Sequence, residues 1–194
     1  NPILKSKIMK MLEICLQIQS YNFFVKFEDH KYTSSFLIFI FESHKNSSFL
    51  KLGYFVDKEV YLQILFKDSL DALMILKELK LIHKRINPKN IYIKNGYVKI
   101  GGFEFIDYLG DGEEDLSMAS QEDMRYMPPE IFLNRKSLFP GQIFSLGMVA
   151  YNFLTNSYPD IDKYLNWNLV VFKQFYSFTK IFTNILKASI KDET

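Results

Sequence analysis

Residues 81–93 of this chain, L-I-H-K-R-I-N-P-K-N-I-Y-I, decide its fold. Three further segments follow them in order: V-K-I-G-G-F-E at residues 98–104, R-Y-M-P-P-E at residues 125–130 and Q-I-F-S-L-G at residues 142–147. Each segment alone is degenerate. All of them in this order and at this spacing form a specific pattern, which an unrelated α-rich domain would leave unexplained.

The first stretch resembles the catalytic loop of the protein kinases, usually written I-I-H-R-D-L-K-P-E-N-I-L-L. In this register His83 and Pro88 fall on the family's histidine and proline, and Asn90 falls on its metal-binding asparagine. Arg85 stands where the family has its catalytic aspartate, and Asn87 stands where it has the loop lysine. The resemblance therefore implies a kinase-like fold with degenerate chemical positions, in which His83 is structural.

Arg85 changes the chemistry that the resemblance implies. In the family the aspartate accepts the proton of the substrate hydroxyl group. A guanidinium group has no lone pair for a proton and stays charged at ordinary pH. General-base assistance is worth about 10²–10⁴-fold in rate, so we expect no catalytic residue at Arg85 or Asn87.

The second segment, residues 98–104, resembles the family's V-K-I-x-D-F-G strand and metal motif. Phe103 is kept, but Gly102 replaces the aspartate that holds Mg²⁺. A glycine offers no ligand, whereas Mg²⁺ is normally bound by one or two carboxylates and by phosphates. Glu104 lies two positions further on, which in an extended segment is the same face. A noncanonical metal site of Asn90 and Glu104 is thus the alternative to no metal site.

The other two segments resemble the end of the activation segment and the start of the next buried helix. Gln142 replaces an aspartate that accepts hydrogen bonds from the catalytic-loop backbone in the family, and its amide oxygen can still accept one. The resemblance also implies a truncated chain. No G-x-G-x-x-G motif is present, so we expect the chain to start after the Gly-rich loop and the strand lysine, and to end before the arginine that pairs with Glu130.

The expected architecture is a partial α+β kinase-like fold. Residues 1–42 would be the remnant of the small lobe, with one helix and antiparallel strands, and residues 43–194 the mainly helical large lobe. Glu42 would begin the hinge, whose backbone meets an adenine ring in the family.

Periodicity and turn residues predict the individual elements. The predicted helices are residues 4–17, a short one at 49–53, a long one from the cap Asp57 to Leu79, one at 146–154 that is buried on all sides, and the tail 164–191. The predicted strands are residues 22–27 and 32–41, joined by a polar turn at 28–31, and residues 91–93 and 97–100 around Asn95-Gly96. Residues 107–122 are predicted to be a mobile loop.

Composition narrows the possible classes of protein. With 48% hydrophobic and 16% aromatic residues, the 194 residues can form one domain with a real core. The formal charge of +2 is near neutral, and no basic stripe is concentrated enough to suggest nucleic-acid binding. A single cysteine, Cys15, excludes an internal disulfide framework and fits an intracellular, cytoplasmic setting. No apolar run is long enough to span a membrane.

Three hypotheses for function follow. The first is a pseudokinase, which does no phosphoryl transfer, needs no cofactor and acts as a scaffold or allosteric regulator of a protein partner such as an active kinase. The second is a kinase domain that binds ATP and Mg²⁺ and keeps residual serine/threonine phosphotransferase activity. The third is a nucleotide-free structural remnant, which the sequence does not separate from the first.

Ser117 and Ser120 stand where activating phosphates often lie in the family. A phosphate there usually pairs with the residue at the position of Lys84. Because the segment is already acidic, one expectation is that Lys84, Arg85 and Lys89 hold it without phosphorylation. The alternative is a solvated loop.

Overall fold

The structure is a computed structural model that describes residues 2–33, 36–43, 58–110, 116, 119–134 and 136–160. Except for the last residue, these belong to one compact unit, residues 1–159. The predicted helix at 49–53, the cap Asp57, Ser117 and the predicted helical tail at 164–191 lie outside the described residues.

The described residues form a mixed fold of helices and short antiparallel strands. The helices are α1 (Pro2–Ile18), α3 (Lys58–Glu78), α4 (Gln121–Met124), α5 (Pro129–Asn134) and α6 (Phe139–Thr155), with two 3₁₀ turns, η1 (Pro88–Asn90) and η2 (Phe103–Phe105). The strands are β1 (Phe27–Tyr32), β2 (Leu37–Phe41), β3 (Leu81–His83), β4 (Ile91–Lys94), β5 (Tyr97–Ile100) and β6 (Ile106–Tyr108). They pair as β1–β2, β3–β6 and β4–β5. The predicted α+β class is confirmed.

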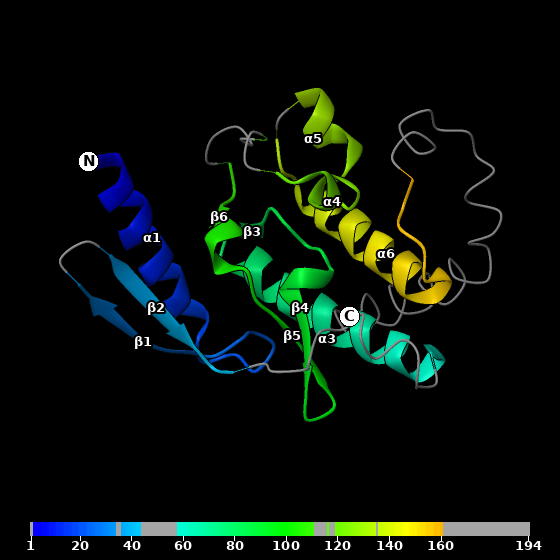
Figure 1. The fold of residues 1–194 in the computed structure, drawn as a ribbon, viewed down its shortest axis with the longest axis horizontal. Helices are drawn as coiled ribbons and strands as arrows, with labels where there is room; N and C mark the ends of the chain where they lie inside the picture. The colour runs from blue at the N-terminus through cyan, green and yellow to red at the C-terminus, as the bar shows by residue number, and fades with distance from the viewer. Residues whose placement is uncertain are drawn as a thin grey trace, which may run out of the picture. The chain divides into compact units, whose positions relative to one another are not determined.

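The long helix α3 organises the core. It packs against α6, β3 and β5, and α3 and α6 run side by side (Figure 1). Apolar side chains at helical spacing are buried on it, among them Leu65, Phe66 and Leu73. The buried Asp68 accepts a hydrogen bond of 2.8 Å from the N–H of Val98, which fixes β5 against the helix. The burial of α3 follows from its 3.6-residue apolar period.

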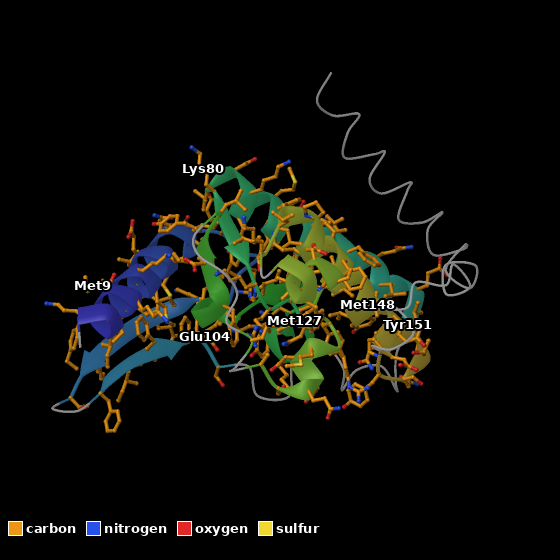
Figure 2. The ribbon with its side chains drawn as sticks, turned by 90° about the horizontal axis from the view of Figure 1, so that it is seen from above. Met9, Lys80, Glu104, Met127, Met148 and Tyr151 are labelled. Atoms are coloured by element: carbon orange, nitrogen blue, oxygen red, sulfur yellow. The ribbon has the colours of Figure 1, made fainter. Side chains whose placement is uncertain are left out.

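Helix α1 and the β1–β2 pair lie next to each other in both views (Figures 1 and 2). Ile14, Cys15 and Ile18 are buried on α1, and the helix contacts β6 and η2. The chain then reaches β5, where the N–H of Val25 donates to the Ile100 carbonyl at 2.9 Å. The segment between α1 and β1 is therefore hydrogen-bonded to the end of β5, just before Gly102.

The predicted register of the first hairpin was wrong. Residues 28–31, expected as its turn, lie inside β1, and the turn falls after Tyr32. There the N–H of Phe36 donates to Thr33 Oγ1 at 2.8 Å, and the N–H of Thr33 donates to the Phe36 carbonyl at 2.8 Å. Most β1 side chains are exposed, so the strand accepts polar residues that resemble a turn in the sequence.

The second hairpin was predicted correctly. Strands β4 and β5 pair from Ile91↔Ile100 to Lys94↔Tyr97. Between them Asn95 and Gly96 both have positive φ, 53° and 81°. This is the backbone of a type I′ turn, for which Asn-Gly is the preferred sequence.

Two further predictions are corrected. Helix α6 begins at Phe139 instead of Leu146, and Leu154 is exposed, so this helix is not buried on all sides. The segment 107–122 is not a loop throughout, because its first residues belong to β6 and its last to α4. Within the described part of the chain, no helix combines the length and apolarity that a membrane crossing requires.

Candidate functional site

His83 ends β3 and is buried. Its backbone N–H donates to Gln142 Oε1 at 2.8 Å, which confirms the predicted acceptor role of Gln142. Its Nδ1 accepts from the N–H of Arg85 at 3.1 Å, so Nε2 carries the proton and donates to the Gly101 carbonyl at 2.8 Å. Burial lowers the pKa of His83 to about 4, against the opposing effect of the bond to Gly101. The imidazole is therefore neutral and both of its nitrogens hold backbone.

Arg85 stands at the predicted base position, and only 5% of it is exposed. Its guanidinium carbon lies 5.2 Å from the centre of the Phe105 ring. That distance lies within the range of a cation–π contact, which a planar guanidinium group makes well. The side chain thus lies against an aromatic ring in the interior and offers no proton acceptor.

Asn87 stands at the position of the loop lysine and has a structural role. Its Oδ1 accepts hydrogen bonds from the N–H groups of Lys89 and Asn90, at 2.9 and 3.2 Å. This is the N-cap of η1. Its Nδ2 donates to Asp123 Oδ1 at 3.0 Å. One side chain therefore shapes the loop and connects it to α4.

Asn90 and Gly102 are the residues that the resemblance places at the family's two metal-binding positions. Asn90 Nδ2 donates to the Arg85 carbonyl at 2.8 Å, and the Asn90 carbonyl accepts from the N–H of Gly101 at 2.9 Å. Gly102 has a left-handed backbone, with φ 74° and ψ 43°. The two residues together offer one neutral amide oxygen, whereas Mg²⁺ in proteins is bound by carboxylates.

Glu104, the alternative metal ligand, lies on the exposed side of η2 (Figure 2). Burial, followed by the charge of Glu104, raises the pKa of Cys15 to about 12 and also raises the pKa of Tyr92. The carboxylate is therefore within electrostatic range of α1 and β4. Glu104 is exposed, and the described part of the chain holds no group of three or more His, Cys, Asp or Glu side chains that could bind a metal ion, so the residues at this place do not fit Mg²⁺.

Glu42, the predicted start of the hinge, is an internal ion-pair partner, with 9% of its side chain exposed. It accepts from Lys99 Nζ at 2.7 Å, from Lys94 Nζ, and from the N–H of Lys26 at 2.8 Å. Burial would raise its pKa, but these bonds outweigh that effect and lower it to about 2. The N–H of Glu42 donates to the Lys26 carbonyl at 2.9 Å, so this donor is engaged within the fold.

Lys84 and Asp107 connect the start of the loop to α1. Lys84 Nζ lies 3.1 Å from Asp107 Oδ2, and Lys10 of α1 forms an ion pair with the same carboxylate. Burial would raise the pKa of Asp107, but the two lysines outweigh it and lower that pKa. Asp107 is thus a carboxylate partner of Lys84, the residue that the resemblance places against an activating phosphate.

Lys89 holds the far end of the acidic segment. Its Nζ lies 2.8 Å from Glu122 Oε2 and 3.8 Å from Asp123 Oδ1. Ser120 caps α4, with its side chain accepting from the N–H of Asp123 and the Asp123 carboxylate accepting from the N–H of Ser120. Of the three basic residues expected to hold this segment, Lys89 contacts α4 and Lys84 contacts β6.

A family model for the protein kinase domain matches residues 3–192. The chain belongs to the protein kinase family. Kinase relatives match it over shorter stretches. cGMP-dependent protein kinase 2 of Rattus norvegicus is 29% identical over 104 residues, which are 52% of this chain and 13% of that protein. The Wee1-like protein kinase of Arabidopsis thaliana is 40% identical over 89 residues, 44% of this chain and 17% of that protein.

A third kinase is the membrane-associated tyrosine- and threonine-specific cdc2-inhibitory kinase wee-1.3 of Caenorhabditis briggsae. It is 34% identical over 93 residues, 47% of this chain and 14% of that protein. The matched part is therefore less than a fifth of the length of each of these relatives.

Some side chains that shape this kinase-family site were not expected from the sequence. Phe105 stacks on Arg85, and Asp107 joins two lysines; no local pattern announces either contact. Asp123 did have a signal, because Ser120 and Asp123 have the spacing of a capping box. Phe41, at the end of β2, stacks on Phe103 with ring centres 4.9 Å apart.

Proposed function

We propose that this chain is a pseudokinase: a kinase-family domain that does no phosphoryl transfer and acts by binding another protein. The observation that carries the proposal is Arg85. A buried cation packed on Phe105 stands at the position of the general base, and a guanidinium group accepts no proton. Restoring a base there requires a different residue and a different packing around it.

The metal positions support the same proposal. Gly102 has no side chain, and Glu104 is exposed on η2. Phosphoryl transfer in this family depends on metal ions that bridge the phosphates and neutralise the developing charge. The alternative, a residual serine/threonine phosphotransferase that binds ATP, needs both a base and a metal site from residues that supply neither.

The proposed partner is a protein inside the cell, and an active member of the same family is our first candidate. Apolar side chains support a protein contact, because α1 carries Met9 and Leu16, each half-exposed (Figure 2 labels Met9). Exposed apolar groups on one helix are a common feature of protein interfaces. The single cysteine of the sequence, Cys15, is buried, which agrees with a reducing compartment.

The test of the catalytic part is a transfer assay. The chain is incubated with Mg²⁺, [γ-³²P]ATP and mixed peptides that contain serine, threonine and tyrosine. We expect no label above a boiled control. Label transferred by the chain and lost in Asn90→Ala would overturn the proposal and favour the phosphotransferase.

The test of the binding part is a titration of the chain into a panel of active kinase domains. We expect a saturable change in kcat/KM for at least one of them, and a weaker effect from Met9→Asp/Leu16→Asp. An unchanged kcat/KM and no binding by calorimetry across the panel would contradict an active kinase as the partner.

A further inference from the structure

A small cavity lies between the end of β3, α5 and the start of α6. Pro128, Ile131 and Leu138 supply apolar parts of its lining. Gln142 and Ser145 of α6 supply polar parts. The volume of the cavity is about 10 Å³, and a water molecule requires roughly 10–15 Å³ together with two to four polar partners. The cavity therefore has room for one water molecule and for nothing larger.

Gln142 contributes a buried amide group to this cavity. The residue is 3% exposed. Its Oε1 accepts from the backbone N–H of His83 at 2.8 Å, while its Nε2 is buried and has no hydrogen-bond partner in the described part of the chain. An unpaired buried donor is costly, and such groups in folded proteins are normally bonded to protein or to ordered water. The amide nitrogen therefore needs an acceptor that the described protein groups do not supply.

Ser145 provides the second polar partner for a molecule in the cavity. It follows Gln142 by three residues on α6, which places the two side chains next to each other on one side of the helix. Its Oγ is engaged as a donor to the Gly141 carbonyl at 3.0 Å, so the remaining lone pairs of the hydroxyl oxygen can accept a hydrogen bond. Both ring nitrogens of His83, which also lines the cavity, are already hydrogen-bonded to backbone groups.

We propose that one ordered water molecule binds in this cavity, accepts from Gln142 Nε2 and donates to Ser145 Oγ. Both ends of the amide group are then bonded, which fixes the orientation that presents Oε1 to the backbone of His83. A flipped amide would place Nε2 against the N–H of His83, and two donors do not bond. The water site thus helps α6 to hold the start of the catalytic loop. The inference concerns the stability of the loop and does not rest on the proposed function.

The direct test is a crystal structure of the 194-residue chain at a resolution that shows ordered water. We expect a single density peak at hydrogen-bond distance, about 2.7–3.2 Å, from both Gln142 Nε2 and Ser145 Oγ. A cavity without a density peak would overturn the proposal. A Gln142 amide whose nitrogen bonds directly to a protein group would overturn it as well.

A double-mutant cycle tests the same bridge in solution, with melting temperature as the readout. We expect Ser145→Ala to lower the melting temperature of the wild type by roughly 2–6 °C. In the Gln142→Met background, where the water has lost its donor, the same change should cost no more than half as much. Equal losses in the two backgrounds would contradict a water shared by the two residues.

Ser69→Ala is the matched control for the cycle. Ser69 is a fully buried serine of α3, and its Oγ has no hydrogen-bond partner in the described part of the chain. It is not among the residues that line the cavity, so its replacement should change the melting temperature equally in both backgrounds. If Gln142→Met does not fold, the crystal structure of the wild type decides.

Discussion

At the scale of single residues, the stretch 81–93 combines two kinds of side chain. His83 holds backbone through both ring nitrogens, and Asn87 holds backbone through its oxygen and the Asp123 carboxylate through its nitrogen; they would do so whether or not a reaction takes place. Arg85 stands at a position that only the reaction needs, and it lies buried against Phe105. The loop is thus stable as a structure with its chemical position altered.

Arg85→Asp tests whether the residue is built into the core. The change removes a cation–π contact and places a carboxylate against the negative face of the Phe105 ring in a buried site. We expect a loss of roughly 3 kcal/mol in the free energy of unfolding, measured by urea denaturation. Arg85→Met, which keeps the apolar stem, is the control and should cost about 1 kcal/mol. Equal stability of the two variants would show that a carboxylate at residue 85 carries no burial cost, and would contradict a position built into the core.

His83 predicts a pH dependence of stability. Its pKa is about 4 in the folded chain and about 6.5 when unfolded. Between these values the unfolded state binds a proton that the folded state does not, so stability decreases as the pH falls from 6.5 to 4. The expected loss from this group is roughly 3 kcal/mol. Denaturation of wild type and His83→Gln at several pH values measures it: the wild-type curve should be the steeper in this window, and parallel curves would contradict the assignment.

At the scale of elements, the catalytic loop and α4 form one connected unit. The cap of η1 and the bond to α4 come from the same residue, Asn87. Lys89 adds an ion pair to Glu122, but both side chains are largely exposed and such pairs are worth at most about 1 kcal/mol. We therefore attribute the position of α4 mainly to the Asn87–Asp123 bond.

Two variants of Asn87 separate its roles. Asn87→Ala removes the cap and the bond to Asp123, and should cost about 1–2 kcal/mol. Asn87→Asp keeps a cap oxygen but places a carboxylate against Asp123, so α4 should detach while η1 remains. Hydrogen exchange of residues 121–124 is the measurement. Faster exchange in Asn87→Asp at low salt, partly reversed at high salt, is expected; unchanged exchange would rule out this connection.

At the scale of the whole described unit, Glu42 joins the end of β2 to the β4–β5 hairpin. Its carboxylate meets Lys94 and Lys99 of the hairpin and the N–H of Lys26 next to β1. The region expected to be a hinge is therefore joined on both sides to one partly buried carboxylate. Removing one partner of such an arrangement leaves the other charges unpaired. The resulting loss in the free energy of unfolding exceeds what the ion pairs themselves contribute.

Glu42→Gln should lower stability at pH 7 by roughly 1–3 kcal/mol. The pKa of Glu42 is about 2 in the folded chain, against an ordinary value of 4.5. Its stabilisation is present above pH 4.5 and is lost as the pH falls toward 2. The difference between wild type and Glu42→Gln, measured by thermal unfolding, should shrink over this range. A difference that stays constant from pH 7 to pH 2.5 would refute the ion-pair account.

The prediction from sequence was accurate where a local pattern has one physical solution. Asn95-Gly96 specified its turn because both residues tolerate positive φ, and the apolar period of α3 placed its buried face. The prediction of the first hairpin was wrong because most side chains of β1 are exposed, and the strand therefore contains polar residues that are also typical of turns. The predicted start of α6 was wrong because its first turns contain a proline, and the side chains buried there are those of Gln142 and Ser145, next to Gly141, instead of apolar ones.

By itself the sequence determined the kinase family and the chemical identity of the altered positions, because side-chain chemistry does not depend on the fold: Arg85 accepts no proton and Gly102 has no side-chain ligand. Only the tertiary structure decided what these positions do instead. Phe105 lies under Arg85, and Asn87 joins the loop to Asp123 of α4. These contacts join residues across different elements, and such distances follow from packing and not from the spacing of residues along the chain.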